Sequence, residues 1–309
     1  MRVCDAAGGS ELVFDADALG QPQLGHIVEN GLLVDRLWAA LAREPGVARH
    51  CPDALASFEQ DEEGVSVELA SGTRLRARLL LGADGAHSRV RELAGIDWRG
   101  ASYGQRAIVA YVRTEKPHED TCWQRFLPTG PLAFLPCGDG RSSIVWSLPE
   151  ADATRLLALE DSRFLTELTR AFDARLGEVT ETSARRAFPL ERHLAETMLS
   201  GRVALLGDAA HVVHPLAGQG VNLGLRDAAA LVPALTEAKE DGRDLAGSRL
   251  QRWARRRESD NAVSSQAFDT INRVFSNDSP LPTLLRGHLL GVANTPPLAR
   301  LLWRRAAGL

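Results

Sequence analysis

The residues best suited to chemistry are an aspartate, two histidines and several glycines gathered between residues 202 and 227. Val203–Leu206 is apolar and predicts a buried strand, Gly207-Asp208 follows it, and a loop rich in Pro and Gly leads to an apolar-periodic segment from about Val221. A carboxylate at a strand end can accept hydrogen bonds from sugar-like hydroxyls. Glycines let backbone approach a flat ring, and the N–H groups at a helix N-terminus face whatever fills the loop. The segment therefore predicts a cofactor site.

This segment resembles the second FAD-binding motif of the FAD-dependent aromatic-ring monooxygenases, the para-hydroxybenzoate hydroxylase class. Its continuation from His214 to Asp227 is similar to the ubiquinone-biosynthesis hydroxylase branch. Gly218, Gly220 and Gly224 nearly imitate a dinucleotide-binding fingerprint, but the third glycine comes one position late and the loop before it is too long. The alternative is an ordinary strand-loop-helix connection with structural glycines. The length of the matching run favours the FAD interpretation.

A second stretch, Gly82 to Arg91, resembles the other signature of this family, which lies near the FAD pyrophosphate and the path of the reduced nicotinamide. Asp84-Gly85 fits a turn in which glycine supplies a positive φ, and Ser88 is suited to cap a short helix that reaches Leu93. A turn and a capped helix would explain this stretch if it stood alone. Beside the first motif, in the order and separation typical of the family, the cofactor interpretation is favoured.

The resemblance implies a set of site residues. Those expected to bind FAD are Asn30, Asp84, Gly85, Gly207, Asp208, Gly218, Gly220, Val221 and Asn222. Those expected beside the reacting ring are Pro215, His211 and His214. Either histidine could help to deprotonate a phenol because an imidazole titrates near neutrality, although for His211 a structural hydrogen bond weighs more. Pro215 lacks an N–H and would leave the oxygen site undisturbed. Asn30 could equally cap the helix that follows it. No protein nucleophile and no metal site are expected.

The implied chemistry is that of the cofactor. FAD, reduced by NAD(P)H or by a protein electron donor, would react with O2 to give a C4a-hydroperoxide that hydroxylates a phenol ring. The protein would supply orientation and a dry pocket. The branch implies an aromatic, polyprenylated substrate, an early ubiquinone precursor. Two alternatives stay open: a flavin hydroxylase of a soluble aromatic metabolite, and a truncated, non-catalytic accessory protein that binds partner hydroxylases or lipid.

The implied fold is mixed α/β (α+β). We expect a truncated FAD/NAD(P)-binding Rossmann-like domain with an inserted, mainly antiparallel substrate sheet and C-terminal helices. The expected parts are 1–96 and 189–270 for the FAD domain, 97–188 for the substrate domain and 271–309 for the C-terminal region. The family's opening βαβ unit has no counterpart, since Gly8-Gly9 is typical of a hairpin turn. Without it, hydrogen bonds to the pyrophosphate worth roughly 1.5–3 kcal/mol each would be lost, so we expect the chain alone to bind FAD weakly or not at all and to be inactive alone.

Composition agrees with an α/β protein. The 309 residues, 44% hydrophobic and 25% charged, can bury a large core, and a net charge of -4 argues against nucleic-acid binding. No run approaches the ~20 apolar residues of a membrane span, no secretory signal opens the chain, and no C-x-x-C spacing is present. We expect reduced thiols and a cytoplasmic location. Ala299–Arg305 is suited to contact with the inner face of a membrane, although packing on its own domain weighs more.

Periodicity gives further expectations. Leu32, Leu33, Leu37 and Leu41 predict an amphipathic helix. The sequence also predicts single strands over 76–81 and 183–188, a helix from Val221 to about Ala238 that Pro233 ends or kinks, and a long polar helix over 245–275.

Overall fold

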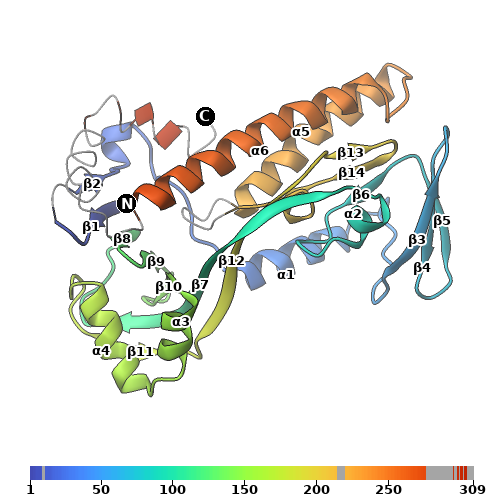
Figure 1. Cartoon of the computed structure of the whole chain (residues 1–309). Coiled ribbons are helices and arrows are strands. Elements are labelled where there is room, and N and C mark those ends of the chain that lie inside the picture. Colours follow the sequence, from blue (N-terminus) through green and yellow to red (C-terminus); the bar gives the residue numbers. More distant parts are fainter. Residues whose placement is uncertain are drawn as a thin grey trace. The chain divides into compact units, whose positions relative to one another are not determined.

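In the computed structural model, the described residues are 1–8, 11–213 and 220–275, with 295, 298, 300, 301, 303 and 304. The chain divides into two compact units (Figure 1). The first comprises residues 1–44, 104–190 and 271–309, and the second comprises residues 45–103 and 191–270. β7 (Trp98–Thr114) and β12 (Arg186–Ala195) each contribute residues to both units. The division at residues 96, 188 and 270 expected from the resemblance stays a prediction.

A β-sheet forms the body of the first unit, with the strand order β7-β10-β9-β8-β1-β2 and with β11 also paired to β7. The pairs are antiparallel except β1 with β8, which is parallel. The other strands of this sheet are β1 (Arg2–Asp5), β2 (Leu12–Val13), β8 (Trp123–Leu127), β9 (Gly130–Pro136), β10 (Ser142–Pro149) and β11 (Val179–Thr182). The antiparallel pairing of β1 with β2 agrees with the predicted hairpin, and the N–H of Gly8 donates to the carbonyl oxygen of Asp5 at 3.2 Å, while Gly9 lies outside the described residues. The strand predicted near 183–188 is confirmed as β12, which begins at Arg186 and, as predicted, leads the chain out of this unit, although it runs on to Ala195.

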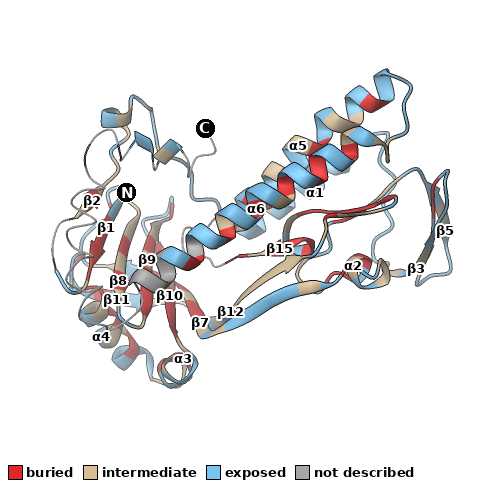
Figure 2. Cartoon of the chain, turned by 45° about the horizontal axis from the view of Figure 1, so that its top comes forward, coloured by how far each residue is buried: buried red, intermediate tan, exposed pale blue. Residues whose placement is uncertain are grey.

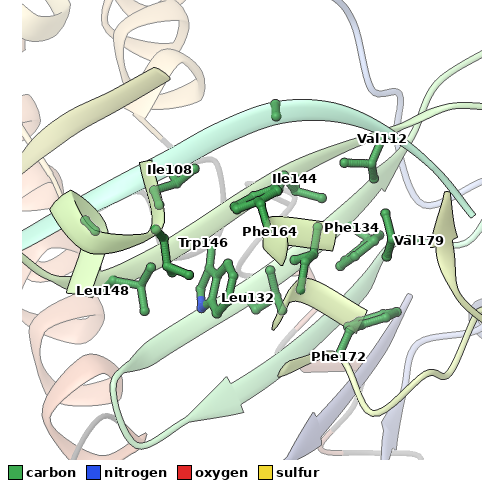
Figure 3. Close-up of a cluster of buried hydrophobic side chains, with 14 of the residues drawn as sticks. Ile108, Val112, Leu132, Phe134, Ile144, Trp146, Leu148, Phe164, Phe172 and Val179 are labelled. Carbon is green, nitrogen blue, oxygen red and sulfur yellow. The ribbon is translucent and has the colours of Figure 1, made fainter. Parts of the chain in front are cut away.

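One face of this sheet carries the core of the first unit. Side chains alternate between the two faces of a strand, and along β10 Ile144, Trp146 and Leu148 are all buried. Figure 2 shows buried residues gathered along the strands of this sheet. Helices α3 (Glu150–Leu157) and α4 (Asp161–Ala171) bury apolar side chains in the same cluster (Figure 3). Phe134 and Phe172 stack there with their ring centroids 3.9 Å apart. The cluster therefore ties the two helices to the sheet.

Helix α1 (Asn30–Leu41) lies where the leucine spacing predicts it. The residue that caps it is Glu29, whose side chain makes no capping hydrogen bond. The alternative that Asn30 caps this helix is therefore wrong, since Asn30 is already its first helical residue. None of its residues is buried, and Leu32 and Leu37 are 51% and 52% exposed. The amphipathic pattern predicted the helix, but its apolar face is open to solvent.

The second unit contains two small sheets, with the orders β3-β4-β5 and β13-β14-β6 among the described residues. Their strands are β3 (Leu55–Gln60), β4 (Val65–Leu69), β5 (Arg74–Ala77), β6 (Leu80–Gly82), β13 (Leu199–Ser200) and β14 (Val203–Leu205). The single strand predicted over 76–81 is wrong. The segment breaks after Ala77 because β5 pairs with β4 while β6 pairs with β14, in a different sheet.

Three helices complete the second unit: α2 (Arg89–Leu93), α5 (Gly220–Glu240) and α6 (Ser248–Phe275). They enclose β14, and Leu205, Leu231 and Leu250 are buried in one cluster. The predicted end of a helix at Pro233 is wrong, since α5 continues through it. Buried residues on either side, Leu231 and Ala238, hold the helix together through packing, which overrides local propensity. No helix of the described residues is long and apolar enough to cross a membrane.

Candidate functional site

The two predicted motif loops leave neighbouring parallel strands of the second unit. β6 ends at Gly82 and β14 ends at Leu205, and these two residues are register partners. The N–H of Leu206 donates to the carbonyl oxygen of Gly82 at 2.9 Å. Because the carboxyl ends of adjacent parallel strands share one edge of a sheet, both loops emerge together. This is the edge at which parallel α/β sheets bind their ligands.

The first loop is a turn followed by a capped helix, as its sequence predicts. Gly85 has a φ of 86°, which favours glycine, and the Ser88 hydroxyl accepts a hydrogen bond from the N–H of Arg91 at 3.0 Å. The carboxylate of Asp84 accepts hydrogen bonds from the Ser88 hydroxyl at 2.5 Å and from the N–H of Val90 at 3.1 Å. Asp84 thus holds the start of α2, with its side chain exposed at the strand edge.

The second loop presents an exposed carboxylate. Gly207–Ala209 forms a 3-10 turn, and Gly207 has a φ of 57°. Asp208 is exposed, and its carboxylate makes no hydrogen bond within the described part of the chain. By contrast, the N–H of Gly207 donates to Asp227 at 3.0 Å. Of the two predicted aspartates, Asp208 is therefore the one whose oxygens are available to a ligand.

The glycines of the two loops fall into two groups. A Cβ at Gly82 would lie 2.9 Å from the Cβ of Val90, and one at Gly224 would lie 3.0 Å from the Cα of Gly207. Packing inside the protein therefore requires these two glycines. A Cβ at Gly220 would meet no described atom within 4 Å. The backbone at Gly220 is open on that side, as is required where a ligand approaches, and the neighbouring Val221 and Asn222 are exposed.

Arg91 joins the two loops. Its guanidinium donates to the carbonyl oxygen of Ala209 at 2.9 Å and to that of Ala86 at 3.0 Å. It also lies over the ring of Trp98, 3.6 Å from the centroid. Burial holds the pKa of Arg91 below its ordinary value, and the charges of Asp84 and Glu92 offset only part of this shift. Sequence reasoning placed Arg91 at the end of the first motif but missed this role, since a contact to the second loop leaves no local signal.

We expect Arg91→Met to weaken FAD binding about tenfold, because two carbonyl groups lose a charged donor and the loops lose their bridge. Titration of FAD against the purified variant checks this. The control is Arg89→Met, since Arg89 lies on the same helix and its ion pair with Glu92 is exposed. Equal affinities of the two variants would contradict the bridging role.

A buried ion-pair cluster lies behind the second loop. His211 in β15 (His211–Val212) is 1% exposed, Asp227 is 0% exposed, and His211 Nε2 lies 2.6 Å from Asp227 Oδ2. Burial raises the pKa of Asp227, but hydrogen bonds from His211, Arg257 and Gly207 together lower it below its ordinary value. This contact is the structural hydrogen bond that the sequence analysis favours for His211 over a catalytic role. The sequence signal for Asp227 is its place between Leu223 and Leu231 on the buried face of α5.

The remaining predicted site residues cannot be placed beside these loops. His214, Pro215 and Gly218 lie outside the described residues, and Asn30 belongs to the first unit. Most of the C-terminal region also lies outside them. The roles expected for all of these residues stay predictions.

Comparison with known proteins identifies the family. A model described as an FAD binding domain matches residues 12–258, a range that contains both loops. The 3-demethoxyubiquinol 3-hydroxylase of Escherichia coli is 38% identical, over 97% of this chain and 77% of that protein. The chain belongs to this family of FAD-dependent monooxygenases. Ubiquinone hydroxylase UbiL of Rhodospirillum rubrum is 40% identical over 100% of this flavoprotein and 72% of that protein. The mitochondrial ubiquinone biosynthesis monooxygenase COQ6 of Danio rerio is 34% identical over 96% and 71%.

Solved structures show the same fold. The p-nitrophenol 4-monooxygenase PnpA from Pseudomonas putida has a TM-score of 0.79 at 18% identity and covers 98% of this flavoprotein and 78% of its own chain. The Diels-Alderase PyrE3 has a TM-score of 0.67 at 25% identity over 90% of this chain and 60% of that one. The predicted mixed α/β fold of the para-hydroxybenzoate hydroxylase class is therefore confirmed, and the predicted family and cofactor are confirmed with it.

The described residues of the flavoprotein fit FAD. The free Asp208 carboxylate can accept hydrogen bonds from ribitol hydroxyls, and Gly220 leaves its backbone open to a flat ring. Both lie in the loop that follows β14, at the edge where β6 also ends. Within the described ranges, no group of three His, Cys, Asp or Glu side chains could hold a metal ion.

Proposed function

We propose that this flavoprotein hydroxylates the phenolic ring of a polyprenylated ubiquinone precursor. The observation that supports the substrate class most directly is the likeness to ubiquinone hydroxylases, which reaches 40% identity over the whole chain. The similar proteins with ubiquinone-related names include a bacterial hydroxylase and a mitochondrial monooxygenase. The substrates would be the ring compound and O2, and the ring carbon that receives the oxygen is not part of the proposal.

Each predicted residue has one task in this proposal. Bound FAD, reduced by NAD(P)H or by a protein electron donor, supplies the activation of O2 that the protein side chains cannot. Asp208 accepts hydrogen bonds from the ribitol, and Asp84-Gly85 forms the loop on the pyrophosphate side. Gly207, Gly218, Gly220, Val221 and Asn222 bring backbone close to the flavin, and Asn30 completes this group of contacts. Pro215 stands at the ring edge, and His214 takes up the phenol proton. His211, the other histidine expected there, is buried against Asp227 and holds the loop instead.

A polyprenyl tail would be held in a lipid bilayer, so the enzyme would have to work at a membrane surface. We place the enzyme on the cytoplasmic side, at the inner face of a membrane, where it can reach the phenol head group. Contact with the membrane surface or with partner hydroxylases would bring it there.

Isotope transfer tests the proposed reaction. The chain would be incubated with saturating FAD, NADPH, 18O2 and a phenol that carries either a polyprenyl tail in detergent or a short alkyl tail. We expect one 18O atom in the ring of the lipid-tailed phenol, no product from Asp208→Ala under the same conditions, and slower turnover of the short phenol. Labelling of the short phenol alone would indicate a soluble aromatic substrate. Bound FAD with no label in either ring would indicate a non-catalytic protein.

A further inference from the structure

Asp227 carries a buried carboxylate whose two oxygens bind different parts of the second unit. Oδ2 accepts the N–H of Gly207 at 3.0 Å and lies 2.6 Å from Nε2 of His211. Oδ1 accepts hydrogen bonds from Arg257 at 2.8 Å and from Asn261 at 3.4 Å. The residue is 0% exposed. One side chain of α5 thus holds the second loop with one oxygen and helix α6 with the other.

The two partners of Oδ2 stand on either side of Asp208 in the chain. Gly207 begins the 3-10 turn Gly207–Ala209, and His211 follows that turn. A single oxygen therefore clamps both ends of the turn, and Asp208 projects from its middle with an exposed carboxylate. The backbone of Gly207 is in the left-handed region. The hydrogen bond from Gly207 to Asp227 holds it there, and so fixes the direction of the following residue, Asp208.

Arg257 fixes the orientation of the clamp. Its Nε donates to Asp227, while its other nitrogens donate to Asp260 at 2.9 Å and to Asn261 at 3.0 Å. The indole N–H of Trp253 donates to the backbone carbonyl oxygen of Asp227 at 3.1 Å. A buried ion pair adds little to stability compared with apolar packing, so its retention calls for another role. Here the charge and the several donors hold the Asp227 carboxylate in one rotamer.

We propose that Asp227, oriented by Arg257, is a positioning residue that shapes the second loop to receive the flavin. Asp227 does not touch the cofactor, and it acts through Gly207 and His211 on Asp208. The inference rests on the proposed FAD site. A core ion pair with no such role would affect folding alone, so a test must separate flavin binding from stability.

The test compares Asp227→Asn with the unmodified chain by FAD titration, by the visible circular dichroism of bound flavin and by thermal unfolding. We expect about tenfold weaker binding and an altered dichroism spectrum, since an amide offers only one acceptor oxygen. The double variant Asp208→Ala with Asp227→Asn should lose less affinity than the product of the two single fold-losses. Both changes act on the same contact, that of Asp208 with FAD.

A pair of neighbouring arginines gives the matched control. Arg257→Gln should weaken FAD binding, and Arg257→Lys should restore part of the affinity because it keeps the charge. Arg256→Gln should have no effect, since Arg256 is exposed on the same helix. If Asp227→Asn fails to fold, Arg257→Gln against Arg256→Gln carries the same comparison.

The outcomes separate this inference from the function on which it rests. If Asp208→Ala leaves FAD binding unchanged, the proposed FAD site is wrong. If Asp208→Ala weakens binding while Asp227→Asn or Arg257→Gln lowers only the unfolding temperature, the site stands and the positioning role is overturned. Additive losses in the double variant would also overturn it.

Discussion

Gly220→Val is expected to abolish FAD binding while the chain stays folded. Gly220 begins α5 at the end of the second loop, and a Cβ there would meet no described atom within 4 Å. Among the described residues, no atom therefore opposes a side chain at this position. A flat ring packed against the backbone would not, and a steric overlap worth about 3 kcal/mol already weakens binding about a hundredfold. FAD titration measures the loss, and far-ultraviolet circular dichroism measures the fold.

Gly46→Val is the control for this variant. Gly46 is exposed in the second unit and belongs to neither loop, and a Cβ there also meets no described atom within 4 Å. We expect its FAD affinity to match that of the unmodified chain. If Gly220→Val also binds FAD normally, the second motif would be a structural connection and the assignment of the ring site would be wrong.

Gly82→Val should have the opposite outcome, a large loss of stability. Gly82 ends β6 next to its register partner Leu205, and a Cβ would lie 2.8 Å from Cδ2 of Leu205 and 2.9 Å from the Cβ and Cγ1 of Val90. Val90 is buried in α2 and cannot move aside. Overpacking by a single group costs about 1–3 kcal/mol, so the three carbons of a valine side chain should lower the free energy of unfolding by at least about 3 kcal/mol.

Denaturant unfolding followed by tryptophan fluorescence measures this effect. Gly82→Ala adds one carbon and should fall between the unmodified chain and Gly82→Val. A stability equal to that of the unmodified chain would show that β6 and α2 do not pack as the structure has them.

Local sequence was sufficient for the loops themselves. Glycines with positive φ, such as Gly85 and Gly207, and the capping Ser88 are encoded within a few residues of the turns that they form. The same holds for the β1–β2 hairpin and for α1, whose leucine spacing is helical. The turns could be predicted for this reason, whereas the family was inferred from the resemblance of the two motifs and is confirmed by the comparisons.

Contacts between distant segments could not be predicted. The break between β5 and β6 arises because β5 pairs with β4 and β6 pairs with β14. The sequence of a strand does not specify its pairing partner. The contacts of Arg257 with Asp227 and of Arg91 with Ala209 join different elements, and nothing in either local pattern marks them. α5 continues through Pro233 because of packing around it. In each case tertiary structure decided the outcome and propensity did not.

Hydrogen exchange of the chain with saturating FAD is the most direct test of the central claim, that the two loops at the ends of β6 and β14 form the FAD site. The method detects weak binding as well as tight binding. We predict slower amide exchange over 82–91 and 205–222 when FAD is added, and unchanged exchange in the antiparallel sheet formed by β8, β9 and β10. Bound FAD that leaves both loops unprotected, or protects only that sheet, would contradict the claim.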